Sequence, residues 1–177
     1  MGNDSKEGIM PSRFDFVYSE PETLAQQIQE YKNKNPHNYK HFVDFNITGK
    51  VIRKSVTEVE IMKRKIQVMD ALLKIILRLV QESKRNKLGY VGEQRLINER
   101  IVSEKSIRQR MNQIKVLFRD SIQDNIIEIK RNKIKQKAYR LSIYPDLIKY
   151  NIENLKNSAD SKIQKIADKL STQQMDN

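Results

Sequence analysis

One regular hydrophobic pattern lies between residues 103 and 118, where apolar residues recur at steps of four, three and four. This spacing predicts a helix with one apolar side. The apolar side consists of Ile107, Met111, Ile114 and Phe118. Ser103 stands where such a helix would begin, and its hydroxyl can accept a backbone N–H group that the first turn leaves free. The opposite side consists of Lys105, Gln109, Asn112 and Val116, with Ser106, Arg108, Gln113 and Arg119 on its flanks.

A wider apolar pattern predicts the longest helix, over residues 57–83. The motif Thr57-Glu58-Val59-Glu60 has the form of a capping box, in which a Thr and a Glu three positions later satisfy free N–H groups at a helix start. Two neighbouring apolar stripes follow, one from Met62 to Val80 and one from Val68 to Leu79. A helix that is apolar over so wide an arc packs against more than one element, so we expect it to be the central core helix.

Shorter elements follow this helix. Residues 88–91 are predicted to be extended, and residues 93–100 form a short helix that directly precedes the helix at 103–118. Two helices joined by about three residues are typical of a helix-turn-helix. Residues 125–130 and 137–143 are predicted strands, and the second alternates between apolar and polar positions. Residues 131–136 join them through a basic loop, so that a hairpin with a basic tip is predicted over residues 126–143.

Less regular segments lie on both sides of this region. Residues 1–18 are polar and contain Gly, Pro and Ser, and we interpret them as a flexible arm. Residues 19–56 are predicted to hold a short helix that begins after Ser19 and stops before Pro36, followed by an extended stretch. Residues 144–177 are predicted to be a helical tail with apolar residues at threes and fours. This tail either packs on the long helix or pairs with a second copy as a coiled coil, and we favour the homodimer.

The predicted order of helix, strand, helix, turn, helix and hairpin is that of a winged helix-turn-helix. The segment Val102-Ser103-Glu104-Lys105-Ser106-Ile107-Arg108-Gln109-Arg110-Met111-Asn112-Gln113-Ile114 resembles the core V-S-x-x-T-I-R-R-x-L-x-x-L of winged helix-turn-helix repressors of the DeoR type. Ser106 stands in place of Thr, and Gln109 in place of the second Arg. The resemblance covers residues 58–143 and implies a DNA-binding domain. The predicted fold class is therefore mainly α (α+β): a winged helix over residues 57–143, with a small β-hairpin wing and helical extensions on both sides.

The positive charge of the chain is concentrated in one segment. Of the net charge of +12, residues 84–141 contribute +10, because they hold 16 Lys and Arg against 6 Asp and Glu. A basic field on this scale favours a polyanionic partner such as double-stranded DNA. A solvated lysine-rich surface without such a partner is the alternative explanation.

Signals for other chemistry are few. The chain has no cysteine, which excludes disulfides and thiolate metal sites. His37 and His41 stand four apart without an evident third ligand, so no metal site is predicted. Tyr139, Tyr144 and Tyr150 could act as nucleophiles in strand transfer, but their regular positions favour packing. We find no phosphate-binding glycine loop and expect no cofactor and no enzymatic activity. No apolar run approaches the roughly 18 residues of a membrane span, and we expect a cytoplasmic, nucleoid-associated protein.

We therefore expect a sequence-specific double-stranded DNA-binding protein, with the recognition helix 103–118 in the major groove and the basic wing 126–143 on the backbone or minor groove. The residues expected to read bases are Lys105, Ser106, Gln109, Asn112 and Gln113. The residues expected to contact phosphates are Arg95, Arg100, Arg108, Arg110, Lys115, Arg119, Arg131, Lys133, Lys135 and Lys137. The expected process is transcription regulation, or replication and maintenance of a mobile element such as a plasmid. The alternative is a winged-helix module that binds a protein in a replication or segregation assembly.

Overall fold

The computed structural model describes residues 20–176, and the chain divides into two compact units, Met1–Pro36 and His37–Asn177. The described part of the first unit contains helix α1 (Glu20–Asn33), which has the bounds that the sequence predicts. Leu24, Ile28 and Tyr31 share one side of α1 and are half-buried. The flexible arm predicted for residues 1–18 lies outside the described residues.

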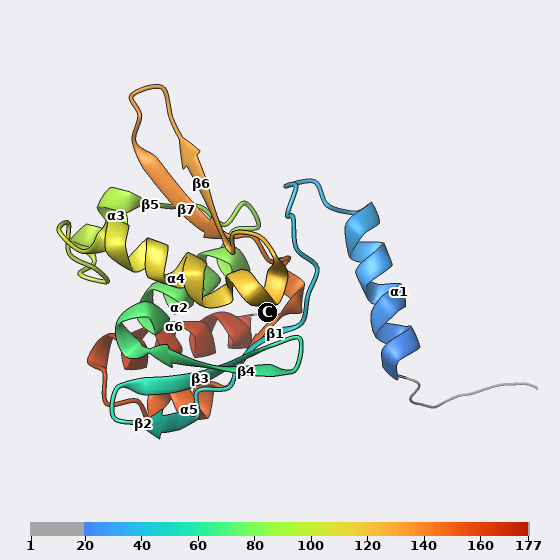
Figure 1. Ribbon diagram of the computed structural model, residues 1–177, viewed down its shortest axis with the longest axis horizontal. Coiled ribbons are helices and arrows are strands. Elements are labelled where there is room, and N and C mark those ends of the chain that lie inside the picture. The colour runs from blue at the N-terminus through green and yellow to red at the C-terminus, as the bar shows by residue number, and fades with distance from the viewer. Residues whose placement is uncertain (1–19, 177) are drawn as a thin grey trace, which may run out of the picture. The chain divides into compact units, whose positions relative to one another are not determined.

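The second unit mixes helices with small sheets (Figure 1), which confirms the α+β class. Its strands are β1 (Phe45–Ile47), β2 (Val51–Arg53), β3 (Val56–Ile61), β4 (Arg64–Met69), β5 (Val91–Gly92), β6 (Ile127–Arg131), β7 (Lys137–Leu141) and β8 (Ile148–Tyr150). Its helices are α2 (Asp70–Arg85), α3 (Glu93–Asn98), α4 (Ile107–Ile122), α5 (Ile152–Lys156) and α6 (Ser161–Asp176), with a 3₁₀ turn η2 (Pro145–Leu147).

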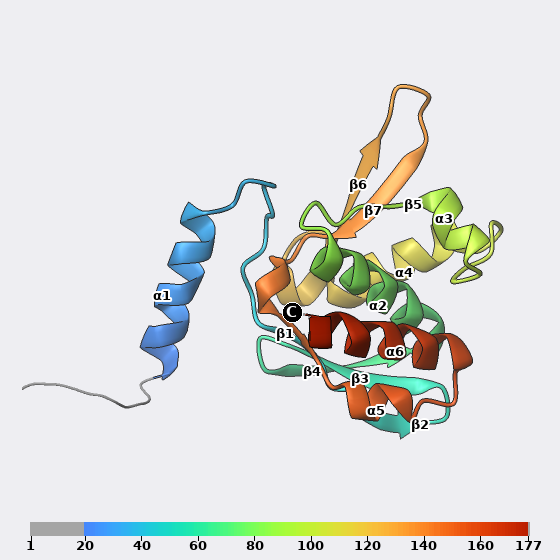
Figure 2. The same cartoon turned by 180° about the vertical axis from the view of Figure 1, so that it is seen from behind.

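Helix α2 forms the centre of the core, as predicted. Its fully buried residues include Leu73, Ile76, Leu77 and Val80. It contacts α4 and α6 as well as strands of both sheets, and Figure 2 shows α6 lying alongside it. Because neighbours surround it on several sides, α2 is apolar over a wide arc.

The long helix predicted over residues 57–83 is wrong in its first half. Residues 56–69 form the antiparallel hairpin of β3 and β4, and α2 begins only at Asp70. The segment is rich in β-branched residues, which favour a strand. Met62 and Lys63 make the two-residue turn, and both have positive φ (49° and 68°), as a type I′ turn requires. Thr57 does not cap a helix, because its Oγ1 donates to Asp70 Oδ1 (2.8 Å) and so joins β3 to the start of α2.

The strands form two sheets. In the first, β3 pairs antiparallel with β4, β2 and β1, and β1 pairs in parallel with β8; β1 and β2 account for the extended stretch predicted before residue 56. In the second, the strand order is β5-β7-β6. Its β6–β7 hairpin pairs from Ile127↔Leu141 to Arg131↔Lys137, which confirms the predicted hairpin. Figure 1 shows this hairpin standing clear of the helices.

The tail after residue 144 does not begin with the helix that the spacing predicts. It consists of η2, β8, α5 and α6, because Ile148–Tyr150 pairs with β1 instead of continuing a helix. The apolar residues of α6 up to Leu170 are Ile163, Ile166, Ala167 and Leu170, and all four are buried. Helix α6 contacts α2 and α5. Within one chain the tail therefore packs on the long helix, and its apolar stripe is covered without a second copy.

Candidate nucleic-acid interface

Helix α3 and the turn after it set the start of α4. Leu96 of α3 is fully buried, and its carbonyl accepts the N–H of Ile101 (3.0 Å). The Ser103 hydroxyl accepts the N–H of Ser106 (3.2 Å), and the Ser103 carbonyl accepts the N–H of Ile107 (3.0 Å). Ser103 thus begins the first turn as predicted, whereas the regular α-helix begins four residues later than expected, at Ile107.

The two sides of α4 differ as the sequence predicts. The buried side consists of Ile107, Met111, Ile114 and Phe118, which are at most 5% exposed. Phe118 packs against Phe45 of β1, with ring centroids 5.8 Å apart. The opposite side exposes Gln109 and Asn112, and Lys105 is exposed in the turn just before α4. Burial of the apolar stripe therefore presents these three polar side chains to solvent.

Some predicted site residues on the flanks of α4 are tied to neighbours. Arg110 Nη1 donates to Gln113 Oε1 (3.0 Å), and both side chains are half-buried. Ser106 is half-buried, and its hydroxyl accepts a hydrogen bond from that of Ser103 (2.9 Å). Arg108 and Arg119 are exposed, and Lys115 is half-buried. The exposed polar side chains of α4 thus include Gln109 and Asn112 on its outward line and Arg108 and Arg119 on its flanks.

The β6–β7 hairpin brings further cations to the neighbourhood of α4. Lys137 lies opposite Arg131 and two positions before Tyr139, so all three share a face of the hairpin. The Tyr139 hydroxyl donates to Glu93 Oε1 of α3 (2.5 Å). Burial raises the pKa of Tyr139, the bond to Glu93 raises it further, and the positive charges of Arg131 and Arg108 act in the opposite direction. Cations of α4 and of the hairpin therefore act on the same buried tyrosine.

The base of the hairpin is held by Arg140, which the sequence patterns do not single out. Arg140 is 3% exposed, and its Nε donates to Glu128 Oε2 (3.0 Å). Its other nitrogens donate to the carbonyls of His37 (2.8 Å) and Leu88 (3.1 Å). The guanidinium carbon lies 4.0 Å from the ring centroid of Tyr39. Its position on the polar side of an alternating strand gave no special signal, and its partners come from distant segments.

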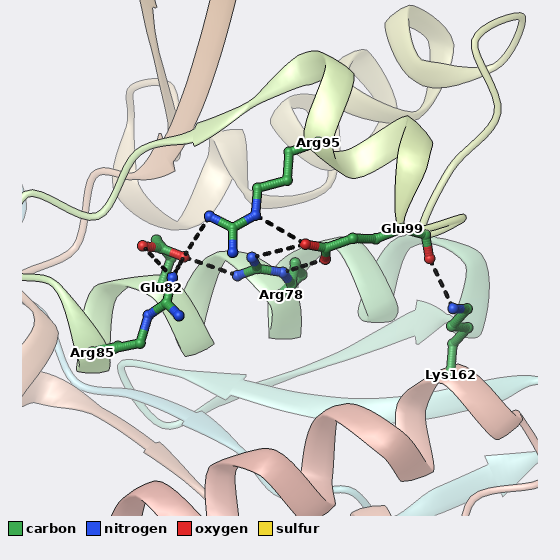
Figure 3. A network of polar contacts seen from close by, with 6 residues as sticks. All are labelled: Arg78, Glu82, Arg85, Arg95, Glu99 and Lys162. Carbon is green, nitrogen blue, oxygen red and sulfur yellow. Dashed lines mark hydrogen bonds and ion pairs between the residues drawn. The ribbon is translucent and has the colours of Figure 1, made fainter.

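A buried charged cluster holds α3 against α2 (Figure 3). Arg78 of α2 is 4% exposed and donates to Glu99 Oε1 (2.7 Å) and Glu82 Oε1 (3.1 Å). Arg95, which we expected to contact phosphate, donates to Glu99 Oε2 (3.0 Å). Lys162 of α6 donates to the Glu99 carbonyl (2.8 Å). The hydrogen bond from Arg78 lowers the pKa of Glu99. These bonds fix α3, and with it the turn that leads into α4.

The other predicted phosphate-contacting residues form no ion pair with a carboxylate of residues 23–174, whose side chains the structure describes. They are Arg100, Arg108, Arg110, Lys115, Arg119, Arg131, Lys133, Lys135 and Lys137. The turn, α4 and the hairpin thus carry positive charge that no acidic residue of the described chain neutralises at contact distance.

Candidates for other chemistry are engaged in packing contacts. Over the described range, no three His, Asp or Glu side chains are grouped to hold a metal ion. His41 lies between Ser142 Oγ (2.7 Å from Nδ1) and Asp124 Oδ2 (3.2 Å from Nε2). Tyr144 stacks on Phe42, with ring centroids 5.3 Å apart. These contacts give the histidine and the tyrosine structural roles.

Comparison with protein-family models, curated proteins and solved structures finds no significant match to this chain. Among residues 20–176, no helix has both the length and the apolar character that crossing a bilayer requires. The function is therefore inferred from the geometry and charge of the surface.

Proposed function

We propose that the protein binds double-stranded DNA sequence-specifically through a winged-helix domain, predicted over residues 57–143. The observation that carries this proposal is the exposed polar side of α4 beside a basic hairpin, both with cations that lack carboxylate partners in the described chain. The major groove is about 12 Å wide and admits a helix presented in this way. Unpaired Arg and Lys side chains suit the phosphates on either side of it.

The order of the elements supports the same proposal. The elements α2, β5, α3, α4, β6 and β7 follow one another along the chain, and β7 lies between β5 and β6. This is the order of helix, strand, helix, helix and hairpin expected of a winged helix. In a helix-turn-helix the second helix of the pair enters the major groove, and that helix is α4 here.

The side chains divide into two groups by position. We assign base reading to Lys105, Gln109 and Asn112, with Ser106 at the first turn. Gln109 and Asn112 can each pair bidentately with adenine, which contributes about 1–3 kcal/mol of discrimination. We assign phosphate contacts to Arg100, Arg108, Lys115, Arg119, Arg131, Lys133, Lys135 and Lys137. Arg95, Arg110 and Gln113 support the site, because each bonds to a neighbouring side chain.

A fluorescence-anisotropy titration on a duplex selected from a random pool tests the proposal. Gln109→Ala should weaken binding to this duplex by about 5- to 150-fold and leave binding to unrelated DNA unchanged. Lys133→Ala combined with Lys135→Ala should weaken both and reduce the slope of log K against log salt by about two, because each phosphate contact contributes about 0.9.

The matched control replaces two exposed lysines of α6, Lys165→Ala and Lys169→Ala, which lie outside the proposed interface. This variant should bind as the unmodified protein does. Failure of the unmodified protein to bind any duplex, or binding that does not depend on salt, would contradict the proposal.

The proposed process is transcription regulation, or replication and maintenance of a mobile element, in the cytoplasm and at the nucleoid. A homodimer belongs to this proposal, but α2 already covers the apolar stripe of α6. Two-fold association must therefore use another surface. A palindromic selected site that binds two protomers in analytical ultracentrifugation would support the dimer, and one protomer on an asymmetric site would contradict it.

One observation favours a second function. A shallow hollow of about 300 Å³ beside α4 is lined in part by Met69, Leu72, Val116 and Leu117. Val116 is 51% and Met69 42% exposed, and exposed apolar side chains suit a protein partner. The alternative is thus a protein-interaction module in a replication or segregation assembly. A nuclease-resistant complex with one stoichiometric protein, lost on Val116→Glu, would favour it.

A further inference from the structure

The tip of the β6–β7 hairpin carries the most exposed large apolar side chain of the described chain. Ile134 is 73% exposed and stands between Lys133 and Lys135. A single exposed apolar residue is ordinary on a protein surface. The geometry of the loop and its distance from the core distinguish this one.

The loop holds Ile134 in a defined position. Asn132 Oδ1 accepts the N–H groups of Ile134 (3.0 Å) and Gln136 (2.9 Å), and Asn132 Nδ2 donates to Gln136 Oε1 (3.0 Å). The Asn132 carbonyl accepts the N–H of Lys135 (2.9 Å), whose φ is 64°. These bonds order the tip within the chain, so a partner meets a preformed shape.

The hairpin carries this tip away from the body of the unit. The third strand, β5, ends at the pair Gly92↔Ala138, and beyond it only β6 and β7 continue, clear of the helices in Figures 1 and 2. From this pair the ladder continues by one further pair, Arg131↔Lys137, at about 3.3 Å per residue, and the loop of residues 132–136 then carries Ile134 beyond the end of the strands. The minor groove is about 6 Å wide and about 7.5 Å deep, which excludes a two-stranded ribbon but admits one side chain.

We propose that Ile134 is an apolar wedge that enters the minor groove and bends the duplex, while Lys133 and Lys135 contact the phosphates on its two sides. The proposal rests on the DNA-binding function proposed above. Apolar side chains inserted between base steps partly unstack them and kink the duplex by about 20–90°. Flexible pyrimidine–purine steps deform most readily, so the wedge adds a preference for such a step beside the site that α4 reads.

Energy transfer between dyes at the two ends of the selected duplex measures the bend, and anisotropy on the same duplex measures affinity. The unmodified protein should shorten the distance between the ends. Ile134→Ala should remove at least half of this shortening and weaken binding by about 3- to 10-fold. Its salt slope should stay unchanged, because no charge is removed. Val51→Ala is the matched control, since it truncates a 56% exposed apolar side chain on β2 and should bend DNA fully.

The possible failures are distinguishable. If Ile134→Ala bends the duplex as strongly as the unmodified protein, or if the unmodified protein binds without bending, the wedge is overturned and DNA binding stands. If the unmodified protein binds no duplex, both the DNA-binding function and the wedge are contradicted. If Ile134→Ala leaves the bend intact but abolishes binding of a protein partner, the tip contacts that partner. The wedge is then contradicted.

Discussion

The position of the β6–β7 hairpin depends on one buried side chain, that of Arg140. Arg140 lies between two aromatic rings, 4.0 Å from the ring centroid of Tyr39 and 4.8 Å from that of Tyr90, and it bonds to Glu128. Removing a guanidinium from water is unfavourable unless its N–H groups find acceptors. Here the acceptors are Glu128 of the hairpin, the carbonyl of Leu88 before β5 and the carbonyl of His37 before β1. The position of the proposed wing thus depends on a residue that is not on its basic face.

Replacing Arg140 tests this mounting. Arg140→Ala should lower the free energy of unfolding by about 3–5 kcal/mol, because it leaves the largely buried carboxylate of Glu128 without its partner. Urea unfolding followed by circular dichroism measures the loss. Lys133→Ala, at the exposed tip of the same hairpin, is the control and should stay within about 0.5 kcal/mol of the unmodified protein. A loss below about 1 kcal/mol for Arg140→Ala would show that the pair is dispensable.

The cluster around Glu99 predicts a pH dependence. The hydrogen bond from Arg78 lowers the pKa of Glu99 in the folded state, so the stabilisation is present above the unfolded pKa of about 4.3 and is lost as pH falls through the folded value. Glu99→Gln should be less stable at neutral pH and should lose less on acidification. Urea midpoints from about pH 7 to about pH 3 measure both effects. Glu104→Gln, which removes an exposed carboxylate, should follow the unmodified profile; a parallel decline for Glu99→Gln would refute the assignment.

At the scale of elements, local periodicity predicted α4 and β7. The apolar stripe of α4 is buried and its opposite side is exposed, so its period identified it. Strand β7 is buried on both faces from Tyr139 to Leu141, but its alternation of apolar and polar residues still indicated a strand. Residues 57–69 were misassigned because Met62 and Met69 continue the helical spacing into α2. Both are exposed, at 40% and 42%, whereas Val59 and Ile61 point inward at strand spacing. Residues 57–69 thus fit both helical and strand spacing, and the pairing of β3 with β4 selects the strand.

The candidate site could be predicted from the sequence only in part. The outward residues of α4 and the basic loop followed from spacing, but the partners of Arg78 and Arg140 did not. Glu99 lies 21 positions from Arg78, and His37 lies 103 positions from Arg140. No local pattern reports contacts of that separation, so the side chains that hold the site in place could be recognised only in three dimensions.

The turn between β3 and β4 offers a stabilising substitution. Met62 and Lys63 both adopt positive φ, which costs a residue other than Gly about 1–2 kcal/mol. Met62→Asn combined with Lys63→Gly supplies the preferred type I′ pair and should raise the free energy of unfolding by about 1 kcal/mol. Lys65→Gly is the matched control, because a glycine within β4 should lower it by about 0.5–1 kcal/mol. Destabilisation by the paired substitution in urea unfolding would contradict the turn geometry.

At the scale of the whole second unit, α2 is the element that the other layers share. Helix α4, which carries the proposed reading face, and α6, which comes from the tail, both pack on it. The last helix of the chain therefore stabilises the helix that supports the interface. We expect the tail to act as part of the core within one molecule.

This role of the tail can be separated from dimerisation. Leu170 is fully buried, and Leu170→Ala should lower the free energy of unfolding by about 2–5 kcal/mol. The urea midpoint should not change with protein concentration, because the packing is intramolecular, whereas a coiled-coil dimer would become more stable at higher concentration. Lys169→Ala, next to it on the exposed side, should have little effect. A urea midpoint that rises with protein concentration would show that the apolar stripe of α6 is a dimer interface.

The parallel pairing of β1 with β8 also bears on how the chain is made. Phe45 and Ile148 are register partners although roughly 100 residues separate them, so at about 5–20 residues per second β1 emerges from the ribosome about 5–20 seconds before β8. Strand β3 can cover one edge of β1 early, but the other edge stays open during this interval. An open apolar strand edge invites pairing with a neighbouring nascent chain. Slow translation through residues 62–147 would lengthen that exposure, so synthesis rate bears on the yield of folded protein.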